Sequence, residues 1–548
     1  MFRENNGHLQ NNLFNSLNSM DSRLAHKLQN SWAALFYEHV FCQIDENSFL
    51  PLYCSDNGRP NFPVNILVGL DLIKHLKEFT DEVLLDEYAF NYQISFALGL
   101  RTLGERYFAP RTLYEFRSRL YNYSLEHPNE ADLIFAQFEK LTDHFIKTAG
   151  LSTSEGRMDS TQIMSNIKLG GRLSLAYDVL VSGVKALPET LLNDSLSIFL
   201  KADYKTKFLY QLKATDIQSR IQMLINHCAE LIQLVEGQPE LKETPVVQNI
   251  DRFLKEQATF DEQQNQWIAK GDREISSTSL QSAYDTDATY RNKGGKKHVG
   301  YALNLTETCA DENPVQVVTD FEVAPNTTSD VEMLNQSLPT LAAQGIKDLY
   351  TDGGYYSPDV MEEAKANGVT MHFTDMTGRK TSRDKLPYGQ FTIEDKKTIL
   401  LCPANHAPLR TSFDEKSGVL SAHFQLELCR ECPHKERCRV KFQKKDTVLR
   451  VNQKALIAEE TRMKIVDRDQ RKESTSKRAA IEGTNSALKR AHNAGKLNVR
   501  GIVKCKLVLG AKIIAHNFRQ LARFFKGDIR KKAIKKLSES KQGIPVSI

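Results

Sequence analysis

The stretch that decides the fold is residues 346–355, which read IKDLYTDGGY. A short apolar run that closes on Asp-Gly-Gly predicts a buried strand whose last residue presents a carboxylate where the chain turns. That residue is Asp352. Ser357 and Pro358 follow and predict the start of a helix. Because side chains at the carboxyl ends of strands line the binding crevice of α/β sheets, Asp352 is a candidate functional residue.

The segments around this strand complete an α/β pattern. Residues 296–305 and 315–323 predict two strands, and residues 330–341 predict a helix with Ser329 as its cap. Residues 369–373 predict one further strand. Hairpin strands followed by helix, strand, helix and strand are typical of an α/β domain with a mixed sheet.

Two more carboxylates are candidate functional residues, one in a strand-like stretch and one in a predicted helix. The strand-like stretch EGRMDSTQI contains Asp159, although an Asp before Ser-Thr is more often a turn or cap residue. The stretch RAAIEGTNSALK, read as one helix, places Arg478, Glu482 and Lys489 close to one face. The ordinary interpretation of an acid between two cations on a helix is a solvated, salt-bridged face.

The N-terminal third is predicted to be helical, from about residue 20 to residue 145. A helix that starts after Pro110 carries Arg111, Arg117 and Arg119 on one side, where they would contact a DNA backbone. The alternative is that these arginines are simply exposed on a core helix. Residues 170–275 are predicted to be mostly helical and show no chemistry of their own, so we interpret them as an insertion.

Nine cysteines in a chain expected in the cytosol argue against a disulfide framework. One C-x2-C pair with two further cysteines favours a zinc site, and an iron–sulfur cluster is the alternative. A histidine could replace one cysteine, the candidates being His406, His423 and His434. The candidate Zn²⁺ ligands are Cys402, Cys429, Cys432 and Cys438.

The composition also bears on the location of the protein in the cell and on its partners. Residues 1–18 lack the apolar segment of a secretory signal, and no apolar run reaches the roughly 18 residues of a membrane span, so we expect a cytoplasmic protein with no membrane partner. From Gly501 onward, 12 Lys or Arg stand against Asp528 and Glu539. A basic tail of this kind suits DNA phosphates, or it is a solvated tail.

At 548 residues the chain is expected to contain about three or four domains. The boundaries that we predict are 1–150 for an N-terminal helical DNA-binding domain, 151–375 with 456–526 for an α/β catalytic core holding a helical insertion at about 170–280, 376–455 for a cysteine-rich insert, and 527–548 for a basic tail.

Asp159, Asp352 and Glu482, on a first strand, a later strand end and a helix after an insert, resemble the Asp-Asp-Glu (DDE) transposases of bacterial insertion sequences. The spacing R-x3-E-x6-K from Arg478 to Lys489 is similar to the helix signature of that family. The resemblance extends to TDGGY, to the N-terminal helical region, to DATYR at residues 287–291 with Gly294, and to the cysteine-bearing insert. One departure is Thr475, where the family signature has a tyrosine that helps to hold DNA.

The resemblance implies an RNase H-like catalytic core. It implies that Asp159, Asp352 and Glu482 bind Mg²⁺ or Mn²⁺, and that Arg478 and Lys489 bind phosphate. The implied activity is cleavage of the element ends followed by joining of their 3′-hydroxyls to target DNA, by two-metal phosphoryl transfer. The implied partner is double-stranded DNA, both terminal inverted repeats and target, in the nucleoid.

Two other functions stay open at this point. An RNase H-like nuclease without strand transfer would use the same carboxylates. A catalytically silent DNA-binding regulator would keep the helical and cysteine modules, although the presence of all three acids weighs against it. Because transposition requires two DNA ends to be held together, we expect a homodimer or larger assembly on DNA.

Overall fold

The computed structural model describes residues 1–10, 15–54, 58–128, 130, 132–168, 170–210, 215–293, 295–374, 385–415, 417–464 and 468–542. Gly294, part of the cysteine-rich insert (376–384 and 416) and the end of the predicted basic tail (543–548) therefore lie outside the described residues. The chain divides into two compact units. The first unit comprises Met1–Ser152, Ser160–Ser329 and Gly483–Ile548, and the second comprises Thr153–Asp159 and Asp330–Glu482.

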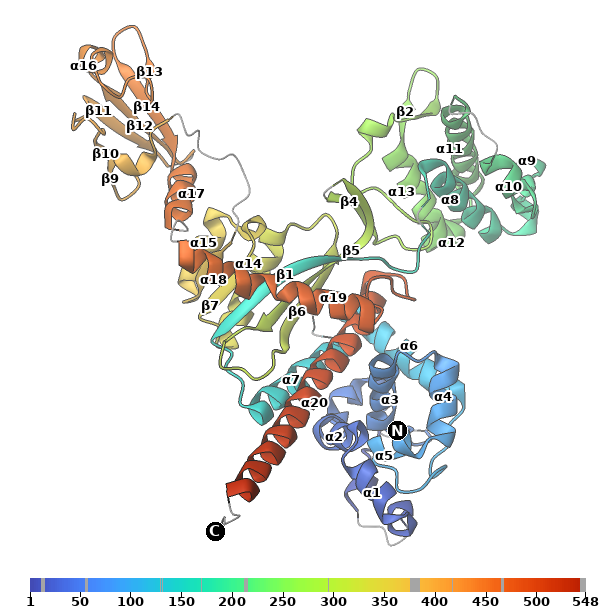
Figure 1. Ribbon diagram of the computed structural model, residues 1–548. Coiled ribbons are helices and arrows are strands. Elements are labelled where there is room, and N and C mark those ends of the chain that lie inside the picture. Colours follow the sequence, from blue (N-terminus) through green and yellow to red (C-terminus); the bar gives the residue numbers. More distant parts are fainter. Residues whose placement is uncertain are drawn as a thin grey trace. The chain divides into compact units, whose positions relative to one another are not determined.

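The N-terminal part of the first unit is helical, as predicted. Its helices are α1 (Ser22–Gln29), α2 (Trp32–His39), α3 (Val64–Lys77), α4 (Asp81–Phe90), α5 (Tyr92–Ala97), α6 (Pro110–Glu126) and α7 (Leu133–Ala149). The side chain of Thr80 caps α4 by accepting a hydrogen bond from the Val83 amide. The long helix α20 (Ile502–Gln542) packs against α3 and α7 in the same unit (Figure 1). No described helix is long and apolar enough to cross a membrane.

The first unit also contains antiparallel strands. Strand β5 (Lys296–Thr308) pairs with β4 (Thr289–Lys293) on one side and with β6 (Val318–Pro325) on the other. Both strands predicted around residues 296–323 are confirmed, the second starting at Val318. Between β1 (Glu155–Ile163) and β4 lie α8 (Arg172–Ala186), α9 (Asp194–Ser197), α10 (Tyr204–Leu209), α11 (Asp216–Leu234), α12 (Pro239–Lys242) and α13 (Pro245–Gln257).

The predicted helical insertion is confirmed up to Gln257, but its last part is wrong. Strands β2 (Ala258–Asp261) and β3 (Gln266–Ala269) form a hairpin there. Cross-strand neighbours Phe260 and Trp267 favour extended backbone, and Asn265 takes the left-handed conformation that the turn needs (φ 51°).

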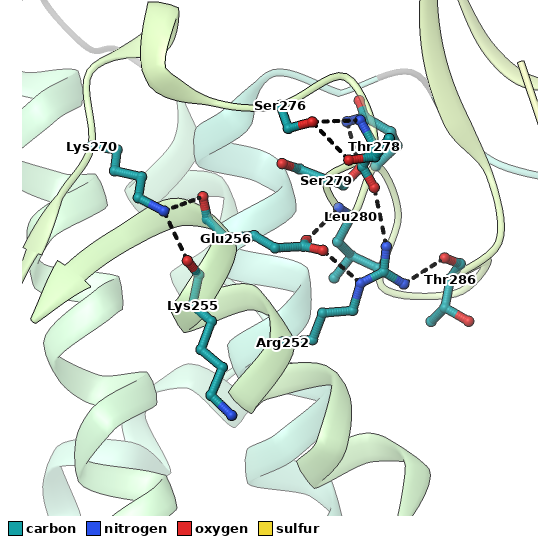
Figure 2. Close-up of polar contacts among 10 residues, drawn as sticks. Arg252, Lys255, Glu256, Lys270, Ser276, Thr278, Ser279, Leu280 and Thr286 are labelled. Atoms are coloured by element: carbon teal, nitrogen blue, oxygen red, sulfur yellow. Dashed lines mark hydrogen bonds and ion pairs between the residues drawn. The ribbon is translucent and has the colours of Figure 1, made fainter. Parts of the chain in front are cut away.

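An arginine on α13 fixes the loop that leaves the insertion. The guanidinium of Arg252 donates to Glu256 Oε1 (2.8 Å), to the Thr286 carbonyl (2.8 Å) and to the Thr278 carbonyl (3.2 Å) (Figure 2). Glu256 in turn accepts from the Leu280 amide (2.6 Å). The loop between the hairpin and β4 is therefore fastened to α13 by charge-assisted hydrogen bonds.

The second unit is built on parallel strands. Strand β1 (Glu155–Ile163) pairs with β7 (Asp348–Thr351), and β7 pairs with β8 (Thr370–Phe373). The strand order is β4-β5-β1-β7-β8 with β6 on β5, so the predicted mixed α/β architecture is confirmed. Helices α14 (Asp330–Ala343) and α15 (Pro358–Ala366) follow the predicted positions, and their apolar side chains pack with those of β7.

The cysteine-rich insert has an apolar core of its own within the second unit. Its core consists of aromatic and aliphatic side chains such as Phe391, Leu420 and Leu449. Its elements are β9 (Thr392–Glu394), β10 (Thr398–Leu401), β11 (Arg410–Asp414), β12 (Val419–Phe424), α16 (Leu426–Arg430), β13 (Lys441–Phe442) and β14 (Thr447–Asn452). Four of its strands form a sheet in the order β11-β12-β14-β13.

Candidate active site

Three helices follow the insert: α17 (Gln453–Lys464), α18 (Arg468–Ala479) and α19 (Ile481–Ala491). The prediction of one helix across residues 478–489 is wrong, because α18 ends at Ala479 and α19 begins at Ile481. Ala480 between them is a strong helix former, so local propensity does not explain the break. Ile481, the first residue of α19, is fully buried. Thr475 is exposed on α18.

The guanidinium of Arg478 brings together the three carboxylates that the sequence predicted. It lies 3.2 Å from Asp159 Oδ1, 2.9 Å from Glu482 Oε1 and 3.8 Å from Asp352 Oδ2. All four residues belong to the second unit. The acids come from a strand, a strand end and a helix start that are far apart in the sequence, and one arginine contacts all of them.

Local backbone geometry fixes the Asp352 carboxylate. The residue follows β7 and caps a 3₁₀ turn, Gly353–Tyr355, by accepting a hydrogen bond from the Gly354 amide (2.7 Å). A Cβ atom at Gly354 would lie 2.9 Å from Asp352 Oδ1, closer than real Cβ contacts allow. A side chain at this position would therefore shift the Asp352 carboxylate.

The three carboxylate side chains differ in solvent exposure. The side chain of Asp159 is 13% exposed, that of Asp352 is 35% exposed and that of Glu482 is 64% exposed. Burial alone would lower the pKa of Arg478, but Asp159, Asp352 and Glu482 raise it above the ordinary arginine value. Arg478 is therefore charged, and the four groups together carry two net negative charges when the acids are ionised.

A second set of contacts holds the end of α18 in place. Lys477 Nζ lies 2.7 Å from Glu155 Oε2 and above the ring of Tyr350, and the Lys477 carbonyl accepts from Arg157 (3.1 Å). Sequence reasoning missed these residues. The signal was present, because Glu155 and Arg157 precede Asp159 at alternate positions and so share one face of β1.

Asp330 is a fourth acid that sequence reasoning missed. Its Oδ2 atom lies 3.6 Å from the Cβ position that a side chain at Gly354 would occupy, beside Asp352. Because Asp330 is the first residue of α14, the sequence alone indicates only a favourable acid at a helix start. The structure adds it to the carboxylates near Asp352.

The donor set fits a divalent cation. Carboxylate oxygens are the ligands that Mg²⁺ and Mn²⁺ prefer, and the excess negative charge would be neutralised by such an ion. Among the described residues, however, no three His, Cys, Asp or Glu side chains are grouped as metal ligands. The Arg478 guanidinium lies between the acids instead, so metal binding requires the arginine to move from this position.

The remaining predicted phosphate ligands lie in the first unit. Arg117 is held by Asp71 (2.6 Å) and Asp81 (2.8 Å), an arrangement that joins α6 to α3 and α4. Arg111 is exposed and pairs with Glu115 one turn away, and Arg119 lies over the ring of Tyr53. The three arginines thus have different surroundings, and Arg117 carries structural ion pairs.

Lys489 lies on α19 in the first unit, where it contributes to a basic environment around His298. Burial lowers the pKa of His298, and the charges of Lys489, Lys293, Lys296 and Arg291 lower it further. The charge of Lys489 on α19 therefore acts on His298, a residue of β5 in the β4–β5 hairpin.

The four cysteines of the insert line one pocket of about 20 Å³ together with His406 and His434. The Cys402 sulfur accepts from the His406 amide (3.4 Å), and the Cys429 sulfur accepts from the Thr447 hydroxyl (3.0 Å). Burial raises the pKa of Cys429 and Cys438. His423 bonds to Asp446 instead (2.8 Å).

Two family models match the sequence. A transposase DDE domain matches residues 401–522, which include the insert from residue 401 onward, Arg478 and Glu482. A second transposase domain matches residues 25–119 in the N-terminal helices. No curated protein matches the chain.

One solved structure is similar at a low level. The cryo-EM structure of the piggyBac transposase synaptic complex with hairpin DNA has a TM-score of 0.27 and 8% identity, covering 94% of this chain and 82% of that chain. A TM-score of this size carries no argument about the fold. The two family matches, at residues 25–119 and 401–522, support an insertion-sequence DDE transposase.

Proposed function

We propose that this transposase cleaves DNA at the ends of its insertion sequence and joins the freed 3′-hydroxyls to target DNA. The observation that carries the proposal is the meeting of Asp159, Asp352 and Glu482 at Arg478. Three acids gathered around one arginine, with an excess of negative charge, are costly for stability alone and suit a site that binds cations. We also propose that β1, β7 and β8 belong to an RNase H-like core.

Asp159, Asp352 and Glu482 would hold Mg²⁺ or Mn²⁺. Bound metal ions in such sites activate the attacking oxygen and stabilise the leaving oxygen. The chain's own contribution is positional. Asp159 is buried, and Asp352 is held by the hydrogen bond from the Gly354 amide, so both provide fixed oxygens. The exposed Glu482 provides the third carboxylate on the solvent side of the site. Arg478, displaced from the acids, would contact a phosphate with its planar guanidinium.

Strand cleavage tests this proposal. Labelled duplexes that carry the flanks of the gene are incubated with Mg²⁺ or Mn²⁺ and wild-type protein, Glu482→Gln or Glu362→Gln. Glu362 is an exposed acid on α15 in the same unit and serves as the matched control. We expect metal-dependent cuts at the element ends with wild type and Glu362→Gln, and none with Glu482→Gln.

Other outcomes decide between the alternatives. Cleavage without joining to a target plasmid would favour a nuclease, and specific binding without cleavage would favour a silent regulator. Titration calorimetry gives a readout that is independent of activity: Mn²⁺ should bind wild type and bind Glu482→Gln more weakly. Equal Mn²⁺ binding by both proteins would remove Glu482 from the ligand set.

For the insert we propose a Zn²⁺ site formed by Cys402, Cys429, Cys432 and Cys438. Its support is that all four cysteines line one small pocket and that thiolates are preferred zinc ligands. Elemental analysis should find one zinc per chain, lost in Cys432→Ser and kept in Cys54→Ser, which alters an exposed cysteine elsewhere. Protein without zinc and with four reactive thiols in the insert would contradict this proposal.

We further propose that duplex DNA is bound by a homodimer or larger assembly, with residues 1–150 contributing to DNA binding. The family assignment supports it, because transposition joins two element ends to one target. Light scattering with paired end duplexes should give the mass of at least two chains. A single chain per complex at all concentrations would rule the assembly out.

A further inference from the structure

The hairpin formed by β4 and β5 in the first unit has one strongly basic face. In its register Arg291 stands opposite His298, and Lys293 stands opposite Lys296. Directly opposite residues share a face, and residues two apart along a strand share it as well. These four side chains therefore lie on one face, whereas Lys297 lies on the other.

This arrangement does not help the hairpin to fold. Like charges directly opposite each other on a sheet are destabilising, and Lys293 and Lys296 form such a pair. Both are exposed, and within the described part of the chain neither side chain has a hydrogen bond or ion pair. An interaction with a partner is the more economical explanation for keeping a repulsive pair at this position.

The positive charge extends beyond the two strands. The charges that act on His298 include Lys489 from α19 as well as Lys293, Lys296 and Arg291. Two segments far apart in the sequence thus place cations in one region of the first unit. Cations that converge on one surface form the usual electrostatic footprint of a nucleic-acid backbone.

We propose that this face of the β4–β5 hairpin, defined by Arg291, Lys293, Lys296 and His298, binds the phosphate backbone of duplex DNA. The inference rests on the proposed DNA transposase function and names a surface for it. The face carries none of the Phe, Tyr or Trp rings on which single-stranded bases stack, which favours a duplex. Lysine contacts to phosphates position DNA without reading its sequence.

The two adjacent lysines of β5 allow a matched test. Lys296 and Lys297 are both exposed and adjacent in sequence, but they lie on opposite faces of the hairpin. The apparent dissociation constant of full-length protein for a fluorescent element-end duplex is measured by anisotropy between low and moderate salt. The proteins compared are wild type, Lys296→Gln, Lys297→Gln and the double variant Lys293→Gln with Lys296→Gln.

We expect Lys296→Gln to reduce the slope of log affinity against log salt by about 0.9, and the double variant to reduce it by about twice as much. Lys297→Gln should leave the slope unchanged. The loss should be equal on a scrambled duplex, because phosphates are contacted. The melting temperature of the double variant should stay the same or rise, since a like-charge pair has been removed.

Three outcomes would overturn the inference in distinguishable ways. Equal slopes for Lys296→Gln and Lys297→Gln would show that the basic face is not the contact. A lowered melting temperature with weaker binding would show that the lysines are structural. Absence of duplex binding by wild type would remove the proposed transposase function and this surface with it.

Discussion

Two cations with restricted solvent access, one in each unit, are surrounded in opposite ways. Arg478 is shared by three carboxylates whose exposure rises from 13% to 64%. Lys512 on α20 is 6% exposed and faces one carboxylate, Glu78, at 3.1 Å, with the His492 carbonyl as a further acceptor. The first group has surplus negative charge and an open side, and the second is balanced and closed. The difference teaches that unbalanced charge with solvent access, rather than burial of charge, marks the candidate for chemistry.

The surroundings of Lys512 support a structural role. Burial lowers the pKa of His75 and His492 to about 3 and that of His516 to about 4, so these neighbours are neutral in the folded protein. Burial also lowers the pKa of Lys512, and Glu78 opposes that shift. The ion pair between Lys512 and Glu78 joins α20 to the end of α3 among these neutral histidines.

The largest expected effect comes from removing an acid at Arg478. Asp159→Asn should lower the rate of end cleavage by more than about 100-fold, since even partners of metal ligands cost about 10- to 100-fold. The melting temperature should change little, because Arg478 keeps Glu482 and Asp352 as neighbours. Cleavage assays and calorimetric melting are compared on the same preparation. Full cleavage activity of Asp159→Asn would show that the acids around Arg478 are not required for catalysis, and the contrast with the structural pair at Lys512 would be lost.

At Lys512 we expect a loss of stability, in contrast to the loss of activity expected at Asp159. Lys512→Met leaves the partly buried Glu78 carboxylate without its lysine partner and should destabilise the first unit by about 3 kcal/mol. Urea unfolding measures this loss. Lys526→Met on the same helix, where the lysine is exposed, should change stability by less than about 0.5 kcal/mol. Equal effects of the two variants would show that the Lys512 pair is not structural.

Acid should weaken the closed cluster. The unfolded chain protonates His75, His492 and His516 near pH 6.5, whereas the folded pKa values are about 3, 3 and 4. The unfolded state therefore binds more protons between these limits, and stability is complete above pH 6.5 and falls as the pH decreases. Each histidine contributes a slope of up to about 1.4 kcal/mol per pH unit. Unfolding free energies that stay constant from pH 7 to pH 5 would contradict the neutral state of the cluster.

The smallest effect is expected at the turn beside Asp352. In Gly354→Ala the new Cβ must displace Asp352 Oδ1 by a few tenths of an ångström. Cleavage should fall by less than about tenfold, below the roughly 100-fold cost of a 1 Å misplacement. Gly237→Ala, which meets no atom within 4 Å, is the control. A rate equal to that of the control would show that the Asp352 position tolerates this shift.

Local patterns predicted the parts of the site but not their assembly. The apolar run before Asp352 and the strand-like stretch around Asp159 could be read from the sequence, because both are short segments that are mostly buried in the fold. The contact of Arg478 with Asp159 joins residues 319 positions apart, and no local pattern encodes it. Asp330 was missed for the same reason.

Tertiary packing also overrode local propensity in two places. The break at Ala480 occurs at a residue that favours helix, next to the fully buried Ile481, so local propensity does not account for it. The β2–β3 hairpin was missed because its strands are short and follow a long helical pattern, in which the β-forming Phe260 and Trp267 were not weighed separately.

The insertion between β1 and β4 has ends that meet and a core of its own. Arg172 at its first helix donates to the carbonyls of Gln257 (2.9 Å) and Lys270 (2.7 Å), so its beginning and its end meet at one side chain. It also has an apolar core of its own, formed by residues between Leu173 and Leu280. Since closing a loop costs little more as the loop lengthens, such a segment can be lost, exchanged or replaced by a fused reporter without lengthening the path from β1 to β4. Variation in size among related chains is therefore expected to concentrate here.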